Sequence, residues 1–321
     1  MSRLLTFGEA MLRFSTPPGQ PLETARHLDL RTAGAESNVA AAAANLGIET
    51  VWWSKLPDSP LGRRITRDLR SHRVRPVVRW TDSGRQGTYY IEDAGAPRGT
   101  SVLYDRGDTP IRGATHEELA EDIDISQMDA CFTTGITPAL SQPLTEMTRG
   151  VFTRAGEADV PTIFDVNYRS KLWAPKEARV VIEQLLRLVD ILVLAERDAK
   201  SVLAHPADAD PEAIADRLTS EYDTQLVIIT HGDTGVTAMT NTGTVYEQPA
   251  IPTDTFDPIG SGDAFVGGFL SGYLRGQSIR EALAIGVTTA AVKRTMMGDI
   301  ATVTPMMIDR IRSESVTDIN R

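Results

Sequence analysis

The order of apolar segments along the chain is the feature that most limits its fold. Short runs rich in branched apolar residues, which are typical of strands, alternate with longer amphipathic or alanine-rich runs, which are typical of helices. This alternation predicts a single α/β domain over residues 1–321, in which helices flank a central, mostly parallel sheet. The expected strands are 3–7, 49–56, 129–135, 161–167, 190–196 and 225–230, and the expected helices are 37–47, 60–74, 142–156, 175–188, 209–221, 264–276 and 279–295.

Two segments, residues 10–33 and 78–108, interrupt this alternation. The second contains RQGTYYIED and TSVLYDRGD, in which polar and apolar residues alternate between turn residues. Such a pattern indicates strands with one buried face. We expect the two segments to form a small antiparallel β lid over the ends of the parallel strands. A lid sheet often pairs across a two-fold axis, so we also expect a homo-oligomer, a dimer or a higher assembly.

Charge and hydropathy exclude several classes of protein. The net charge is −10, with 43 acidic and 33 basic residues, which argues against nucleic acid or an anionic membrane as a partner. No run of about 18 apolar residues could span a membrane, and Glu9 and Arg13 interrupt the apolar stretch that a signal peptide would need. We therefore expect a cytoplasmic protein. The single cysteine, Cys131, lies in an apolar segment and is interpreted as a core residue.

The basic residues are unevenly divided between five lysines and 28 arginines. An acidic, lysine-poor surface is what a high-salt cytoplasm favours. A GC-rich genome gives the same preference for arginine, so the composition alone leaves a halophilic origin open.

The sequence DPIGSGD (257–263) carries the most specific chemical signal. Gly260, Ser261 and Gly262 have little or no side chain, so the backbone N–H groups of this turn can approach an anion at the start of the following helix. Asp263 lies within reach of the same point. Donors for phosphoryl charge beside a carboxylate that accepts a hydroxyl proton suit phosphoryl transfer. The structural alternative is a glycine turn with an aspartate cap.

Two better-known nucleotide motifs are absent from the sequence. No G-x-x-x-x-G-K-[ST] loop occurs, and GSGDAFVGG (260–268) lacks the spacing and the N-terminal position of a dinucleotide fingerprint. A nicotinamide oxidoreductase is therefore the weaker α/β alternative.

A second glycine-containing segment, AGAESNVAAAAANLG (33–47), lies near the N-terminus. Gly34 allows close approach of a ligand, and Asn38 can bind a polyol hydroxyl; an N-capped helix is the structural alternative. With DPIGSGD near the other end, the chain resembles the ribokinase-like, phosphofructokinase-B type sugar kinases. The resemblance implies a large α/β domain with a small β lid and ATP-dependent, Mg²⁺-assisted phosphorylation of a sugar hydroxyl.

The resemblance also implies roles for individual residues. Asp263 would be the general base, and the N–H groups at Gly260, Ser261 and Gly262 would form an anion hole. THGDTG (230–235) resembles the family's nucleotide segment, so Thr230, Gly232 and Gly235 would lie near ATP. The family also implies a monovalent cation, K⁺, beside residues 253–257.

Two family motifs are altered in this chain. SKLPDSPLG (54–62) keeps Asp58 and Gly62 but has Ser54 and Pro57 where the family has glycines. The usual N-x-x-E sequence after a central strand is AERD, with Ala195 and Asp198 at the two positions. The residues that organise Mg²⁺ are therefore left open, with Asp198 as a candidate that would act through water.

Several short motifs point to an acidic sugar. GTY (87–89), YDR (104–106) and DVNYRSKLW (165–173) are similar to segments of the branch that phosphorylates 2-keto-3-deoxygluconate. Arginine binds a carboxylate in a bidentate, directional way. The resemblance assigns substrate contacts to Gly34, Asn38, Tyr89, Tyr104, Arg106, Ile136, Arg169, Asp263 and Asp299, and places Asn167 towards the phosphates of ATP.

The sequence thus predicts transfer of a phosphoryl group from ATP to O6 of 2-keto-3-deoxygluconate. The galactonate epimer differs by one inverted hydroxyl and is not distinguished from it by any of these motifs. The alternatives are a fructokinase or ribokinase acting on a neutral sugar and a nucleotide-binding regulator without catalysis.

Overall fold

The centre of the molecule is a nine-stranded sheet. A computed structural model describes residues 2–94 and 96–313 of the chain. All pairings from β11 to β5 are parallel, and β12 and β13 add two antiparallel pairings at one edge. This arrangement confirms the mostly parallel sheet. In spatial order the strands are β13 (Val245–Pro249), β12 (Gly235–Thr240), β11 (Leu226–Thr230), β10 (Ile191–Ala195), β9 (Thr162–Asp165), β8 (Ala130–Thr134), β1 (Arg3–Phe7), β4 (Glu49–Pro57) and β5 (Arg75–Thr81).

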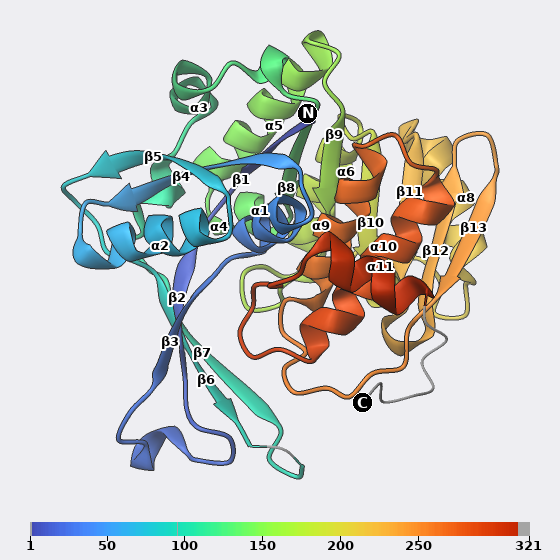
Figure 1. The fold of residues 1–321 in the computed structure, drawn as a ribbon. Coiled ribbons are helices and arrows are strands. Elements are labelled where there is room, and N and C mark those ends of the chain that lie inside the picture. The colour runs from blue at the N-terminus through green and yellow to red at the C-terminus, as the bar shows by residue number, and fades with distance from the viewer. Residues whose placement is uncertain (1, 95, 314–321) are drawn as a thin grey trace.

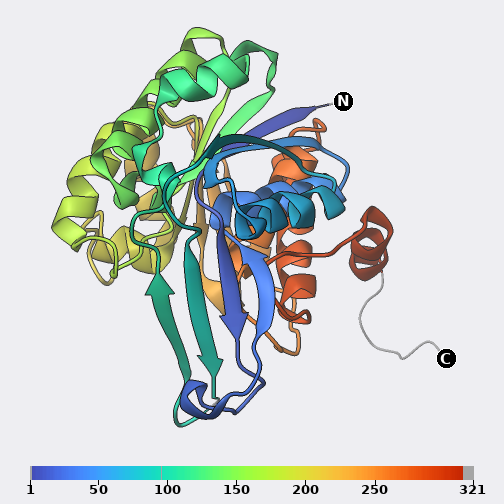
Figure 2. The same cartoon turned by 90° about the vertical axis from the view of Figure 1, so that its left-hand side faces the viewer.

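Helices cover both faces of this sheet (Figure 2). Successive strand residues pack on opposite faces: Leu5 and Phe7 of β1 lie in one core cluster, and Leu4 lies in the other. Apolar residues on both faces are typical of a parallel sheet between two helical layers. One layer holds α3 (His116–Asp122), α4 (Ile136–Leu140), α5 (Gln142–Glu157), α6 (Pro175–Leu186), α7 (Glu196–Ser201) and α8 (Pro211–Tyr222), and the other holds α1 (Ala35–Asn45), α2 (Pro60–Ser71), α9 (Ser261–Tyr273), α10 (Ile279–Arg294) and α11 (Pro305–Ser313).

A second, four-stranded sheet extends away from the body of the molecule (Figure 1). It is the expected lid, and two of its three pairings are antiparallel, while β2 and β6 run parallel. We call it the lid sheet. Its strands, in spatial order, are β3 (Asp29–Ala33), β2 (Met11–Ser15), β6 (Thr88–Asp93) and β7 (Thr100–Asp105).

The second lid segment begins later than the expected residue 78. Residues Arg75–Thr81 form β5, which pairs in parallel with β4 at the edge of the main sheet. Most residues of this edge strand are half-buried, so its mixture of polar and apolar residues does not distinguish it in the sequence from a lid strand.

Small residues bring α1 and α9 unusually close together. A Cβ atom on Gly267 of α9 would lie 2.5 Å from Ala42 Cβ and 2.8 Å from the carbonyl oxygen of Val39 on α1. The alanine-rich sequence of α1 and the glycines of α9 therefore have a shared purpose, which is to let the two helix backbones pack directly against each other.

Two expectations about the rest of the chain can be compared with the structure. Cys131 is fully buried in β8, and burial raises the pKa of its thiol to about 12, so it is a core residue as expected. In the described part of the chain, every helix is too short or too polar to cross a membrane.

Candidate active site

One cavity of about 660 Å³ lies between the carboxyl ends of the parallel strands, the start of α9 and the lid sheet. Ligands of open α/β sheets bind at this edge. Every residue that the sequence assigned to substrate, nucleotide, anion hole or Mg²⁺ lines this cavity. They are Gly34, Asn38, Tyr89, Tyr104, Arg106, Ile136, Asn167, Arg169, Asp198, Thr230, Gly232, Gly235, Gly260, Ser261, Gly262, Asp263 and Asp299. Residues 253–257, expected beside K⁺, do not line it.

The turn before α9 has a geometry that requires glycine. Gly260 has φ = +82°, a left-handed conformation that is costly for residues with a Cβ atom. A Cβ atom there would also lie 2.1 Å from the carbonyl oxygen of Asp299, whereas one on Gly262 would touch nothing within 4 Å. The backbone of Gly260 is thus fixed against residue 299, and the N–H groups of the first turn of α9 lie at the cavity.

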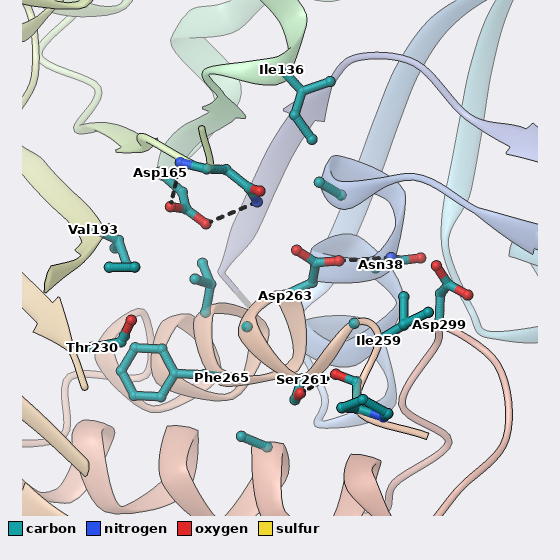
Figure 3. Close-up of a pocket in the computed structure, with 18 of the residues that line it drawn as sticks. Asn38, Ile136, Asp165, Val193, Thr230, Ile259, Ser261, Asp263, Phe265 and Asp299 are labelled. Atoms are coloured by element: carbon teal, nitrogen blue, oxygen red, sulfur yellow. Dashed lines mark hydrogen bonds between the residues drawn. The ribbon is translucent and has the colours of Figure 1, made fainter. Parts of the chain in front are cut away.

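Asp263 lies at the start of α9 with Asn38 of α1 on one side (Figure 3). Asn38 Nδ2 donates a hydrogen bond of 2.7 Å to Asp263 Oδ2, and the close packing of α1 on α9 makes this contact possible. Burial raises the pKa of Asp263 to about 6, and the hydrogen bond from Asn38 opposes the rise. A carboxylate with this pKa is charged at neutral pH and is basic enough to accept a hydroxyl proton.

Asp165, at the end of β9, is a second buried carboxyl group beside the same cavity. Its Oδ1 and Oδ2 accept hydrogen bonds from the backbone N and the Nδ2 of Asn167, at 3.1 and 3.2 Å. These two bonds hold Asn167 at φ = +37°. Burial and the nearby charges of Asp263 and Asp198 raise the pKa of Asp165 to about 8. Asp165 is therefore mostly protonated at neutral pH.

A buried charge cluster connects the lid sheet to the turn before α9. Arg13 of β2 binds Asp299 Oδ1 at 2.7 Å and Asp257 Oδ2 at 2.8 Å, and all three side chains are at most 6% exposed. The hydroxyl group of Tyr89, on β6, donates to Asp299 Oδ2 at 2.7 Å. Tyr89 thus approaches the substrate region with its ring, while its hydroxyl group is engaged by Asp299.

The two arginines expected to bind an acid reach the cavity from different parts of the fold. Arg106 follows the lid strand β7, packs over the ring of Tyr104 at 5.5 Å and forms an ion pair with the buried Glu9. Its Nε atom is buried and has no hydrogen-bond partner among the described residues. Arg169 follows β9 and is exposed, and its charge lowers the pKa values of the buried Asp165 and Asp263.

The end of the cavity that lies away from Asn38 and Asp299 is suited to a nucleotide base (Figure 3). Thr230, at the end of β11, and the glycines Gly232 and Gly235 of the following turn line it with backbone rather than with large side chains. Phe265 lies on the same side (Figure 3). Other apolar residues that line the cavity include Val236, Ala250, Ile251, Val287, Ala290 and Ala291.

Comparison with known proteins agrees with this geometry. The model of a family described as pfkB family carbohydrate kinase matches residues 1–305. The chain belongs to this family. It is a carbohydrate kinase, and pfkB kinases use ATP with Mg²⁺.

Three related proteins extend the comparison. The kinase is 52% identical over 320 residues to a 2-dehydro-3-deoxygalactonokinase from Haloferax volcanii, which covers 100% of this chain and 99% of the relative. The solved structure of a 2-dehydro-3-deoxygluconokinase from Thermotoga maritima has a TM-score of 0.87 at 28% identity and covers 98% of each chain. A structure from E. coli, assigned as a ribokinase II and solved with ATP and Mg²⁺, has a TM-score of 0.86 and covers 98% of this chain and 100% of the other; its 17% identity shows the fold alone.

The residues that this kinase offers to Mg²⁺ are few. In residues 2–94 and 96–313, no group of three or more His, Cys, Asp or Glu side chains could hold a metal ion. Asp198, at the start of α7, is buried, and its Oδ2 accepts a hydrogen bond from the backbone N of Tyr168 at 3.2 Å. Mg²⁺ keeps several waters and is held largely by substrate phosphates, so a single carboxylate that acts through water fits its binding.

Several charged residues near the site, among them Asp165, Glu9, Arg13 and Asp257, were not identified from the sequence. Asp165 carried a signal, because it ends an expected strand at the edge where α/β ligands bind. The signal in the sequence was weaker for Glu9, Arg13 and Asp257. Each is a charged residue in or beside an apolar stretch, and such a residue is expected to find a partner once it is buried.

Proposed function

We propose that this kinase transfers the γ-phosphoryl group of ATP to O6 of a 2-keto-3-deoxy sugar acid, with Asp263 as the general base. The observation that carries the proposal is the presence of Arg106 and Arg169 in the same cavity as Asp263 and the glycine turn. A neutral hexose would offer no carboxylate to either guanidinium group. Relatives that carry the names of 2-dehydro-3-deoxy acid kinases, where "dehydro" denotes the same keto group, support this substrate class.

Arg106 has donors to spare for the substrate carboxylate. One Nη group is used by Glu9, and the buried Nε lacks a partner in the described part of the chain. A buried donor without a partner is costly, so a carboxylate that accepts from it gains a strong, charge-assisted hydrogen bond. The role of Glu9 is to fix the guanidinium plane, and Tyr104 supports its face.

The reaction follows from the two groups that flank the reacting hydroxyl. Asp263 accepts the proton of O6 as the oxygen forms a bond to the γ-phosphorus and the bond to the β-phosphate oxygen breaks, releasing ADP. The N–H groups of Gly260, Ser261 and Gly262, with that of Asp263 and the helix dipole of α9, stabilise the charge on the transferred group. Asn38 holds Asp263 with its Nδ2, and its buried Oδ1, which has no partner in the described residues, accepts from a sugar hydroxyl.

Mg²⁺, when bound with ATP, offsets the negative charge of the β- and γ-phosphates. Asp198 and the side-chain oxygen of Asn167 are the groups that this chain provides for its water ligands. Thr230, Gly232 and Gly235 lie beside the nucleotide.

The relatives favour the galactonate epimer as the preferred substrate. The kinase is 52% identical to a relative named for the galactonate acid and 28% identical to the solved structure named for the gluconate acid. We therefore infer that 2-keto-3-deoxygalactonate is phosphorylated with the higher kcat/KM, and that the gluconate epimer is a second substrate.

The test is a change of specificity in Arg106→Ala. Its kcat/KM on the sugar acid is expected to fall about 10- to 100-fold, because a hydrogen bond to a charged group contributes roughly 1.5–3 kcal/mol, while any slow turnover of fructose stays unchanged. Arg85→Ala is the matched control, since Arg85 is a lid arginine that pairs with Asp105 outside the cavity. Equal losses on acid and neutral sugars in Arg106→Ala would disprove the carboxylate contact.

A further inference from the structure

Lys293 is a buried cation that the reaction above does not use. It lies near the end of α10, and it is the one lysine of the five in the chain whose side chain is fully buried. Its Nζ donates to the carbonyl oxygens of Asp257 and Met296, at 3.0 and 3.2 Å. Burial lowers the pKa of this lysine, and the charges of Asp257 and Asp299 oppose that change. Burying an ammonium group costs free energy, and its hydrogen bonds to backbone carbonyls must offset that cost by stabilising the segments that carry them.

The two carbonyls belong to segments that flank the turn before α9. Asp257 begins this turn, and its carboxylate accepts from the backbone N of Ile259 at 3.0 Å and from Gly298 N at 2.9 Å. Residue 299, three positions after Met296, has its carbonyl oxygen against Gly260. Lys293 therefore links, at one point, both pieces of backbone that determine where Gly260 lies.

The neighbouring acids do not neutralise Lys293 by direct contact. The carboxylates of Asp257 and Asp299 both bind Arg13. The ammonium group thus acts on the backbone of residues 257 and 296, and the guanidinium group acts on the side chains of residues 257 and 299. Lys293 and Arg13 therefore both hold this turn, the first through backbone carbonyls and the second through carboxylates.

We propose that Lys293 is a positioning residue whose ammonium group holds the Asp257–Gly260 turn in the conformation that presents the N–H groups of α9 to the transferred phosphoryl group. The inference rests on the proposed anion hole and adds the residue that supports it. The chain itself thereby supplies a positive charge beside residues 253–257, where the family resemblance implied a monovalent cation.

The test compares Lys293→Met and Lys293→Ala with the wild type, using purified full-length protein, Mg·ATP and the sugar acid. Preorganised donors to a transition state are each worth about 10²–10³ in kcat, so loosening the turn is expected to lower kcat by roughly 10- to 100-fold in both variants. KM for the sugar acid should stay within about threefold, because its arginine contacts follow β7 and β9 and do not belong to the turn. Ammonium chloride, compared with tetramethylammonium chloride at equal ionic strength, is expected to restore kcat in Lys293→Ala, where a vacated space lined by carbonyl oxygens can accept NH₄⁺. It should not restore Lys293→Met, whose side chain fills that space.

Leu283→Ala is the control for lost stability. Leu283 is buried on the same helix but lies outside the cavity, so its truncation is expected to lower the unfolding temperature and leave kcat unchanged. A full kcat in Lys293→Met would overturn the proposal. Two results together would also overturn it: ammonium fails to restore kcat in Lys293→Ala, and Leu283→Ala shows the same loss of kcat at a similar unfolding temperature. An inactive wild type would instead contradict the proposed function, which keeps the two failures apart.

Discussion

At the scale of single residues, the environment of Asp263 determines what it can do. The same carboxylate on a solvated helix start would be a cap with an ordinary pKa. Here burial raises its pKa to about 6, and Asn38 limits the rise by donating to the charged form. The group is therefore ionised near neutral pH and is held in one orientation beside the cavity.

Asp263→Asn is expected to abolish turnover while ATP still binds. An amide of the same shape cannot accept the hydroxyl proton, and a general base contributes about 10²–10⁴ to the rate. The measurements are kcat by ADP release and the dissociation constant of ATP by titration calorimetry. A variant that keeps most of its kcat would show that Asp263 is not the base.

The pH dependence of kcat/KM should report the same group. Because Asp263 must be deprotonated to act, activity is expected to rise with pH and level off above its pKa of about 6. Asn38→Ala removes a hydrogen bond that favours the charged form of Asp263, so the rise of kcat/KM should occur at higher pH in this variant. If kcat/KM rises at the same pH in Asn38→Ala as in the wild type, Asp263 is not the group whose ionisation the profile reports.

Asp165→Asn is expected to stabilise the fold at pH 8. The pKa of Asp165 is raised to about 8 in the folded protein and is near 3.9 when unfolded. For an acid with a raised pKa, stability is complete below the unfolded value and is lost as pH rises towards the folded value. The gain in unfolding temperature should therefore be largest at pH 8 and shrink at pH 5, and a gain independent of pH would contradict this account.

At the scale of elements, the site depends on how closely α1 approaches α9 and the turn before α9 approaches residue 299. Gly267 lets α9 contact α1, and Gly260 lets the turn contact residue 299. The sequence allowed these elements and the motif residues to be predicted, because each is encoded by neighbours along the chain. The roles of Arg13 and Lys293 could not be predicted from the sequence, because each depends on a partner more than 30 residues away that only the folded chain brings near.

Gly260→Ala should damage both stability and catalysis. A residue with a Cβ at φ = +82° is strained by roughly 1–3 kcal/mol, and this Cβ would also collide with the carbonyl of Asp299. We expect a lower unfolding temperature and a fall in kcat larger than the change in KM. Gly276→Ala, at φ = +76° in an open position, is the matched control and should lose stability alone.

At the scale of the whole molecule, the acidic surface affects the conditions under which the kinase folds. With a net charge of −10 and five lysines, like charges repel across the surface, and salt screens that repulsion. The relative from Haloferax volcanii suggests the halophilic interpretation. The unfolding temperature is expected to rise substantially between roughly 0.1 M KCl, where the screening length is about 10 Å, and 1 M, where it is about 3 Å. Equal stability at both concentrations would leave genome composition as the explanation.

The fold class was predictable at this scale because apolar alternation specifies a parallel sheet between helices. The boundary between the lid and the main sheet was not, because β5 is an edge strand whose half-buried pattern matches that of a lid strand. The distinction depends on which strand it pairs with.

The most direct test of the account is the rate of ADP release with Mg·ATP at high KCl on five substrates: 2-keto-3-deoxygalactonate, 2-keto-3-deoxygluconate, fructose, ribose and adenosine. The account predicts turnover confined to the two keto-deoxy acids, with the galactonate acid the better of the pair, because the arginines of the cavity bind a carboxylate. Comparable turnover of fructose or ribose would contradict it, since a site that accepts them does not depend on that carboxylate.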